Sequence, residues 1–581
     1  MSDVSPDFDL VIRGGMLADG TGNPLRQGDV AITGGRIAAV GNISGRGREE
    51  IDAAGKLVTP GWVDVHTHYD GQVTWSNRID PSSGHGVTTA VMGNCGIGFA
   101  PVRPDDHDTL MRLMEGVEDI PEPVLSAGVP WCWESFGDYV NWLATRSYDL
   151  DVGPLLPHAA LRLYVMGERA AALEPATPED TRQMAALAHD AIKAGALGFS
   201  TSRALNHRSS DGHHTPTLEA GERELEAIAR AMMEAGGGVM QFILDISTTD
   251  HDMPMMLGIA ERTGCPVTFS LLQHPQKPDR WRETLDQIEA AAARGLNVTA
   301  QVAARAIGIM LGLELTRHPF RSRPSYRAIA HLPLAERASL MADPALKAKI
   351  LSEADDPDDD FVHRLKDYSG VFDLGSPPDY EQPPENAIGP RARAAGVDPQ
   401  SIAYDAMVRD GGRGMLYMPA LNYANGSLDP TYEMLRSARA IPGLSDGGAH
   451  CGIICDASFP TFLLTHWGRD RTHGQKLDLP YLVALQTRKA AEAFGLYDRG
   501  LLAPGYKADV NVIDFDALRL HPPHVTYDLP KGGRRLMQKA DGYVATIVSG
   551  AVTQRNGEPT GALPGRMVLG QREAPAALAA E

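Results

Sequence analysis

The chain has 581 residues, 43% of them hydrophobic, and its 54 basic and 74 acidic side chains give a formal net charge of −20. This length is too great for one simple core, so we expect one large domain and a smaller one. The acidic balance argues against a nucleic-acid partner or an anionic membrane surface, and it favours a soluble enzyme that acts on a small molecule.

The N-terminal residues, Met1 to Asp9, are acidic and lack the basic-then-apolar pattern of a signal peptide. No stretch approaches the ~18 uninterrupted apolar residues that a membrane span needs. The five cysteines are scattered and odd in number, which suits a reducing compartment. We therefore expect a cytoplasmic protein without a membrane partner, in which a special cysteine is a metal ligand or a buried thiol.

Short β-rich runs occupy both ends of the chain. Between residues 8 and 40 three such runs are separated by Gly-Gly and Asp-Gly turns, which predicts hairpins. Similar runs lie at 508–514 and 543–550. We interpret residues 1–60 and the C-terminal part of 486–581 as one small β-sandwich domain, with a last helix before it and a tail after it. The alternative is that each end only decorates the core.

Residues 61–485 alternate strand-like and helix-like segments, which predicts an α/β fold with a parallel sheet. Eight strands would close a TIM-like (β/α)₈ barrel. The eight candidate strands are 57–68, 87–96, 152–163, 196–203, 238–245, 266–273, 297–302 and 438–446. A doubly wound open sheet is the alternative, but no Gly-x-Gly-x-x-Gly follows the first strand.

The stretch from about 304 to about 437 is far too long for a plain loop between two barrel strands. It is interrupted by prolines and carries an acidic run at 353–360. We interpret it as a lid-like insertion that covers the mouth of the barrel.

Four potential metal ligands follow predicted barrel strands. His66 and His68 end the first strand on the same face, Cys95 ends the second, and Asp446 ends the last. Taken alone, Cys95 is more often explained as a buried thiol, and Asp446 as the start of an Asp-Gly turn. Because the carboxyl ends of parallel strands meet, the four together predict a site for a divalent metal, most simply zinc.

At this point the chain resembles a known family. Residues 86–101, from Gly-Val-Thr-Thr-Ala-Val-Met-Gly-Asn-Cys onward, are similar to the D-aminoacylase branch of the amidohydrolase superfamily, as are 117–121 and 131–136. The His-x-His and Ser-Asp-Gly motifs are typical of the whole superfamily. The resemblance runs from about residue 8 to about residue 555 and implies hydrolysis of a small-molecule linear amide, such as an N-acyl amino acid. It also suggests a homo-oligomer, since dimers and tetramers are common among similar proteins.

Two features depart from the family pattern. D-aminoacylases carry a metal-binding histidine after the fifth strand and another after the sixth. This chain has Gln241 at the first place and Leu271-Leu272 at the second. His274 is nearby but is shifted by an odd number of residues from Leu271, so in a regular strand it faces the other way. We therefore expect one metal rather than two, held by His66, His68 and Asp446, with Cys95 as an additional ligand or a neighbour.

Three further residues are candidates for contacts with the substrate, and each has an ordinary alternative. His158, in the third predicted strand segment, would polarise a carbonyl group or else be a core histidine. Arg203, at the end of the fourth strand, would clamp a carboxylate through its planar fork or else be a surface arginine. Gln241 would be a weak ligand or a substrate contact, or else would simply pack.

The expected mechanism follows from the ligands. A bound divalent ion lowers the pKa of its water toward about 7, and Asp446 takes the proton of that water and returns it to the departing amine. One alternative keeps the site but cleaves a cyclic amide, a carbamate or an ester, although the fourth strand ends without the lysine that hydantoinase-like relatives use. Another is a metal-free barrel that serves as a binding or scaffold protein.

Overall fold

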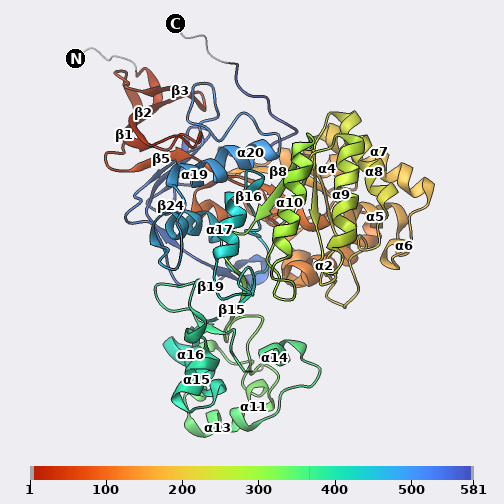
Figure 1. The fold of residues 1–581 in the computed structure, drawn as a ribbon, viewed down its shortest axis with the longest axis vertical. Coiled ribbons are helices and arrows are strands. Elements are labelled where there is room, and N and C mark those ends of the chain that lie inside the picture. Colours follow the sequence, from red (N-terminus) through yellow and green to blue (C-terminus); the bar gives the residue numbers. More distant parts are fainter. Residues whose placement is uncertain (1–5, 366, 577–581) are drawn as a thin grey trace.

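The computed structural model describes residues 6–365 and 367–576, and its centre is an eight-stranded parallel sheet (Figure 1). The predicted tail falls partly on residues 577–581, which lie outside the described residues. The strands of this sheet are adjacent in chain order, which confirms the predicted (β/α)₈ barrel. They are β6 (Trp62–Asp64), β7 (Val87–Met92), β8 (Asp151–Pro157), β9 (Gly198–Ser202), β10 (Val239–Ile243), β11 (Val267–Ser270), β12 (Val298–Val302) and β16 (Ala440–Pro442).

The sheet closes where the chain continues beyond its first and last strands. The amide of Asp446 donates to the carbonyl of His66 at 3.2 Å, and the amide of His68 donates to the carbonyl of Gly447 at 2.8 Å. A parallel bridge between Thr67 and Gly447 lies between these two bonds. The closure of the barrel therefore sets the His-x-His segment directly beside the Ser-Asp-Gly segment.

Helices cover the outside of the barrel. Among them are α7 (Pro178–Ala194), α8 (Glu222–Ala235), α9 (Thr249–Thr263) and α10 (Arg280–Ala293) (Figure 1). Helix α7 starts where Thr177 and Asp180 form a reciprocal capping box and ends at Gly195, which has a positive φ. Start and stop signals in the sequence thus define this helix.

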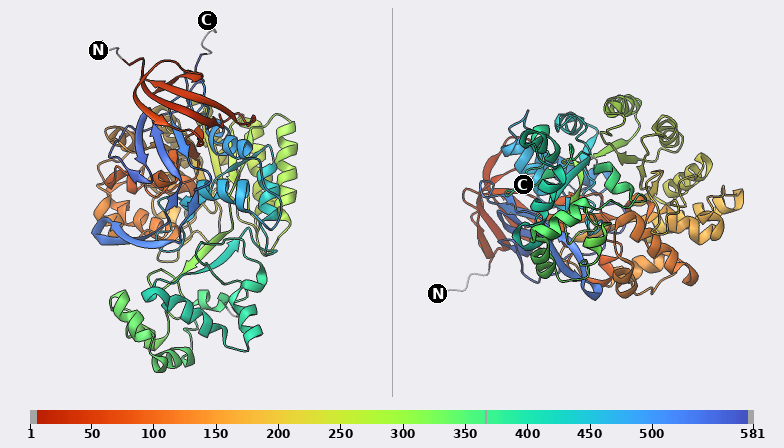
Figure 2. Two further views of the ribbon diagram at one scale, coloured as in Figure 1. Left: turned by 90° about the vertical axis from the view of Figure 1, so that its left-hand side faces the viewer. Right: turned by 90° about the horizontal axis from the view of Figure 1, so that it is seen from below.

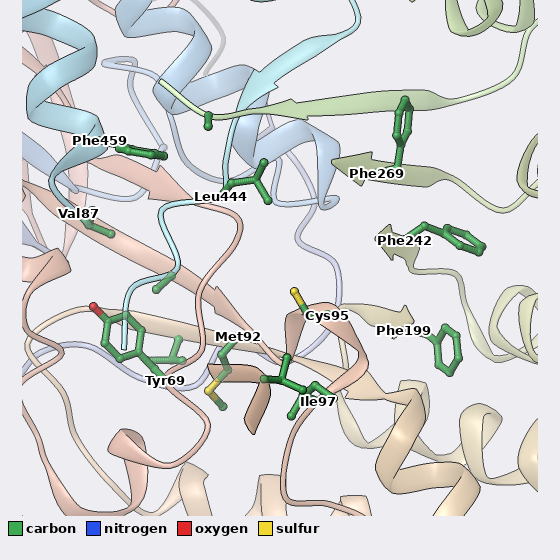
Figure 3. Packing of buried hydrophobic residues seen from close by; sticks show 14 of the residues in the cluster. Tyr69, Val87, Met92, Cys95, Ile97, Phe199, Phe242, Phe269, Leu444 and Phe459 are labelled. Carbon is green, nitrogen blue, oxygen red and sulfur yellow. The ribbon is translucent and has the colours of Figure 1, made fainter. Parts of the chain in front are cut away.

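Side chains alternate between the helix layer and the interior of the barrel. Phe199, Phe242 and Phe269, on three neighbouring strands, point away from Cys95 (Figure 3). Their chain neighbours therefore face inward. Gln241 on β10 pairs in register with Ser200 on β9 and with Thr268 on β11, so a row of polar side chains lines the interior.

The first predicted strand, 57–68, is divided between two sheets. Its first part, β5 (Leu57–Pro60), joins the terminal sheet, and only β6 belongs to the barrel. Gly61 separates the two strands, and a Cβ atom on it would lie 2.2 Å from Thr88 Oγ1. The apolar run is continuous because both strands are buried, so its pattern gives no sign of the division.

The second sheet is built from both ends of the chain, as predicted (Figure 2). Within the described residues it has nine strands, and β5 pairs antiparallel with β17 at the junction of the two halves. The other strands are β1 (Phe8–Leu17), β2 (Arg26–Thr33), β3 (Arg36–Gly41), β4 (Gly47–Asp52), β22 (Tyr543–Val548), β23 (Ala551–Arg555) and β24 (Glu558–Pro559), with β17 at Val510–Ile513.

The segment between β12 and β16 projects from the barrel and has its own apolar core (Figures 1 and 2). It contains a three-stranded sheet of β13 (Ile307–Leu311), β14 (Phe372–Asp373) and β15 (Leu416–Leu421). The helices between β13 and β15 are α11 (Pro324–Arg327), α12 (Leu334–Met341), α13 (Pro344–Ser352), α14 (Asp360–Leu365), α15 (Ile388–Ala395) and α16 (Pro399–Gly412), and α17 (Asp429–Arg436) follows β15.

A buried ion pair fastens this insertion to the rest of the protein. Glu381 of the insertion accepts two hydrogen bonds from the guanidinium of Arg471, at 2.8 and 3.0 Å, and lies 2.9 Å from His466 Nε2. Arg471 and Glu381 are both nearly inaccessible to solvent. Because water reaches neither group, each buried charge is compensated by the other, and removal of either one would leave an uncompensated charge in the interior. In the described part of the chain, no helix has the length and apolar character that a membrane crossing requires.

Candidate metal centre

The four predicted metal ligands come together at the closure of the barrel. His66 Nε2 lies 3.3 Å from Cys95 Sγ and 3.5 Å from Asp446 Oδ1. His68 Nε2 lies 3.7 Å from Cys95 Sγ and 3.6 Å from Asp446 Oδ1. Both imidazoles and the thiol are buried, and the carboxylate of Asp446 is 14% exposed.

These separations fit a divalent cation. Zinc bonds of about 2.0–2.3 Å to nitrogen, oxygen and sulfur place the ligand atoms of a tetrahedral site about 3.3–3.8 Å apart. The four distances from the imidazole nitrogens fall inside this range. Among the described residues, the ligand atoms of His66, His68 and Cys95 all lie within 4.8 Å of one another, and Asp446 approaches this set from the side of the two imidazoles. Two imidazoles, a thiolate and a carboxylate are also the donor types that a borderline metal accepts. The residues present therefore suit such an ion.

Unusual backbone conformations aim two of these side chains. Cys95 has a φ of +57°, and Asp446 has a φ of +48°. Left-handed conformations are costly for residues other than glycine and occur often at functional sites. Gly93, at φ +83°, begins the Cys95 turn, and its amide donates to Asp70 Oδ2 at 3.0 Å. The turn after β7 is thereby tied to the segment that follows His68.

Burial and the neighbouring groups shift the pKa values of the side chains at this centre. Burial opposes ionisation of Asp446, but a hydrogen bond to His68 and the charges of both imidazoles outweigh it and hold the pKa of Asp446 well below its usual range. Burial lowers the pKa of His66 to about 4 and raises the pKa of the Cys95 thiol to about 12. A bound cation favours the neutral imidazole and the thiolate, which are the forms that coordinate metals.

A polar side chain faces the other ring nitrogen of His66 and of His68. His66 Nδ1 lies 2.6 Å from Gln301 Oε1, on β12, and His68 Nδ1 lies 3.4 Å from Glu118 Oε1, at the end of α2 (His107–Glu118). Sequence analysis did not single out Gln301 or Glu118. Gln301 could have been recognised as a polar residue inside an apolar strand. Glu118 could have been recognised from its place in the Val-Glu-Asp-Ile-Pro segment.

Gln241 is also brought to the centre. Its Oε1 accepts from the amide of Cys95 at 3.1 Å, which supports the turn that carries the thiol. Its Nε2 is buried and has no hydrogen-bond partner among the described residues. The interior position of this side chain follows from the alternation along β10.

His158 is not brought to the centre. Strand β8 ends at Pro157, and His158 is the first residue of helix α5 (His158–Met166), so the predicted strand 152–163 is a strand followed by a helix. His158 Nδ1 lies 2.8 Å from Thr201 Oγ1, and its Nε2 lies 2.7 Å from Glu224 Oε1, on α8. The ring packs at 4.8 Å against Phe199, which points away from Cys95 (Figure 3). His158 therefore lies in the helix layer.

Arg203 also turns toward the helices. Its Nε donates to Asp252 Oδ1 at 2.8 Å, and its NH1 donates to the carbonyl of Ala220 at 2.9 Å. The side chain of Asp252 on α9 is 1% exposed. The guanidinium is thus engaged in a buried pair that holds α9 against the barrel.

A histidine that sequence analysis did not consider stands in the loop after β9. His207 Nδ1 lies 2.8 Å from Ser202 Oγ, the last residue of that strand. Burial lowers the pKa of His207 to about 4, with a further lowering from the positive charges of His450 and His68. Its position at the carboxyl end of a barrel strand was the signal in the sequence.

Comparison with known proteins identifies the family of this chain. A model of the amidohydrolase family matches residues 49–554. An N-acyl-D-aspartate deacylase of Alcaligenes xylosoxydans xylosoxydans is 34% identical over 301 residues, which are 50% of this chain and 55% of the relative. The chain thus spans about half the length of the curated deacylases that it matches.

Two solved structures share the fold. One is a D-aminoacylase studied for the functional role of its binuclear metal center, with one-metal activation and second-metal attenuation. Its TM-score is 0.65 at 24% sequence identity, and the match covers 97% of this chain and 100% of that chain. The other is an N-acyl-D-glutamate deacylase from Bordetella bronchiseptica complexed with zinc and a phosphonate inhibitor, with a TM-score of 0.63 at 23% identity, covering 97% and 99%. The family model covers well over half of the chain and confirms the family expected from residues 86–101, so this protein belongs to the amidohydrolase family.

Proposed function

We propose that this protein is a metal-dependent hydrolase that cleaves a linear amide, most simply an N-acyl amino acid, into a carboxylic acid and an amine. The observation that carries the proposal is the convergence of two imidazoles and one thiol, whose ligand atoms lie within 4.8 Å of one another, with a carboxylate 3.5 and 3.6 Å from the two imidazoles. Family membership supports hydrolysis, and the deacylases among the relatives act on N-acylated acidic D-amino acids by their names.

The ligands would be His66, His68, Cys95 and Asp446, and a divalent ion held by them would supply Lewis-acid chemistry for activating water and polarising the amide carbonyl. Asp446 is the only one of the four whose side chain reaches solvent appreciably, at 14% exposure. It would accept the proton of the attacking water and return it to the departing amine. The amide is thereby split with the elements of one water molecule, and no oxidant or other reactant is needed.

One ion, most simply zinc, accounts for the donors better than two. The interior row that follows Cys95 around the barrel consists of Ser200, Gln241 and Thr268, none of which is an imidazole or a carboxylate. Neutral hydroxyl and amide oxygens are weak ligands for a borderline metal. Arg203 and His158, both engaged in pairs with the helix layer, contribute to stability in this account rather than to substrate binding.

The proposal is tested with a panel of N-acyl D- and L-amino acids, simple alkyl and aryl amides, and cyclic amides. Each is assayed with protein that has been stripped by a chelator and then reconstituted with zinc, manganese or cobalt. We expect release of a carboxylic acid from linear N-acyl substrates only after reconstitution. Turnover by the stripped protein, or stoichiometric metal binding without hydrolysis of any linear amide, would contradict the proposal.

A further inference from the structure

Glu118 is a buried carboxylate whose nearest charged neighbours are two imidazoles. It is 1% exposed, and neither of its oxygens makes a hydrogen bond of normal geometry within residues 6–365 and 367–576. Burying a charged carboxylate without compensation costs several kcal/mol. The formation of helix α2 does not explain why a carboxylate is buried at this position, so another role is needed.

Two imidazoles face this carboxylate, one from each of the two chain segments that close the barrel. Glu118 Oε1 lies 3.4 Å from His68 Nδ1, and Glu118 Oε2 lies 3.5 Å from His450 Nε2. His68 belongs to the segment after β6, whereas His450 belongs to the loop after β16 that carries Asp446. The backbone amide of His450 also donates to the carbonyl of Glu118. One side chain therefore lies between both segments that form the candidate metal centre.

We propose that Glu118 is a positioning residue, whose carboxylate holds His68 with its Nε2 directed at the cation and ties that ligand to His450 in the loop of Asp446. This inference rests on the cation site proposed above. When Nε2 coordinates a metal, Nδ1 carries the proton and needs an acceptor, and a carboxylate is the strongest one. His66 has a neutral acceptor in Gln301, so the two imidazoles are held by groups of different charge.

The same turn extends the connection to the insertion. Asp119, directly after Glu118, accepts from the amide of Gly452 at 3.0 Å and from the hydroxyl of Thr316 at 3.2 Å. Thr316 lies in the insertion, and its own amide donates to the carbonyl of Gly452 at 3.1 Å. The loop that carries Asp446 and His450 is thus held by the end of α2 and by the insertion together, which gives Glu118 a fixed position relative to both imidazoles.

The test compares zinc affinities of chelator-stripped and reconstituted full-length variants by competition with a chromophoric chelator. Glu118→Gln keeps the shape and a neutral acceptor but removes the charge, and Glu118→Ala removes both. We expect affinity to fall by about 10–100-fold in Glu118→Gln, as for other partners of metal-bound histidines, and further in Glu118→Ala. Glu118→Asp should recover part of the loss. Glu122→Gln, an exposed carboxylate at the start of α3 (Glu122–Gly128), should bind zinc like the wild type.

Absorption spectra of the cobalt-substituted proteins distinguish a positioning role from a purely structural one. The visible cobalt bands would not shift if Glu118 only stabilised the fold. A reoriented His68 changes the ligand field, so Glu118→Gln should shift the visible cobalt bands, and Glu122→Gln should not. If Glu118→Gln does not accumulate in folded form, Glu118→Asp carries both measurements. Wild-type affinity and an unshifted spectrum in the folded Glu118 variant would overturn this inference alone. Failure of the wild type to bind any metal would instead overturn the proposed function.

Discussion

Ser445 Oγ donates a hydrogen bond of 2.5 Å to Asp64 Oδ2 and so joins the last barrel strand to the first. The other oxygen of Asp64 accepts from the amide of His66 at 3.3 Å. One buried carboxylate thus orients the backbone of a predicted metal ligand and the residue before Asp446. The contacts that close the barrel therefore also position the residues of the candidate centre.

Ser445→Ala should weaken both the closure of the barrel and the candidate metal centre. It leaves a buried acceptor without its donor, which costs about 1–3 kcal/mol of unfolding free energy, and it loosens the loop that positions Asp446. The expected result is a lower denaturant midpoint together with lower zinc affinity. Ser352→Ala serves as the control, since the hydroxyl of Ser352 makes an exposed hydrogen bond in the insertion. A Ser445→Ala protein with normal zinc affinity would show that the bond only supports the fold.

Asp446→Ala should reduce turnover by at least about 10²–10⁴-fold, because it removes the group that transfers the proton between water and the leaving amine. His66, His68 and Cys95, which lie within 4.8 Å of one another through their ligand atoms, should still retain part of the metal. The measurement is kcat at saturating zinc beside the zinc content of the same sample. Near-normal kcat in this variant would remove Asp446 from the mechanism.

His158→Gln should destabilise the protein without emptying the metal site. Both ring nitrogens of His158 have partners in the helix layer, and the side chain is completely buried. Loss of one buried partner costs about 1–3 kcal/mol. Unfolding by urea should therefore occur at lower concentration, whereas zinc content stays at the wild-type level. Lost turnover with unchanged stability would return His158 to the catalytic role expected from the sequence.

The pairing of Glu381 with Arg471 should make the attachment of the insertion sensitive to acid. Burial opposes ionisation of Glu381, but hydrogen bonds from His466 and Arg471 outweigh it and lower its pKa from 4.5 to about 2. Since the pKa is lower in the folded state, the pair contributes its full stability above pH 4.5 and loses it as the pH falls toward 2. The difference corresponds to about 3 kcal/mol.

Glu381→Gln removes the titrating group, so its deficit in unfolding free energy relative to the wild type should be largest at neutral pH and shrink below about pH 4.5. Denaturant titrations across this range measure the deficit. Glu385→Gln, an exposed carboxylate of the same insertion, should show none. A deficit that does not change with pH would mean that the pair is not charged in the folded protein.

The sequence predicts the ligands of the centre because one rule of parallel barrels covers all four. His66, His68, Cys95 and Asp446 each follow a strand, and the carboxyl ends of the strands meet at one face. Glu118 lies outside this rule, since it reaches the centre from the far end of a helix, 23 residues beyond Cys95 in the numbering. Contacts of that kind depend on how the helix packs.

The secondary structure at His158 and the extent of the first strand differ from the prediction for a related reason. Residues 152–163 form one apolar run because both β8 and the start of α5 are buried, and periodicity does not separate a buried strand from a buried helix. In the same way, the run 57–68 conceals a change of sheet at Gly61. Sequence patterns report burial, whereas the site depends on which buried face a residue occupies.

The most direct test of the account is the metal content of the purified protein, measured by elemental analysis before stripping and after reconstitution with zinc. The account predicts about one divalent ion per chain in the wild type, and loss of that ion in a His66→Ala/His68→Ala variant that keeps its fold. A folded wild-type protein that takes up no ion, or a double variant that binds metal as tightly as the wild type, would contradict it.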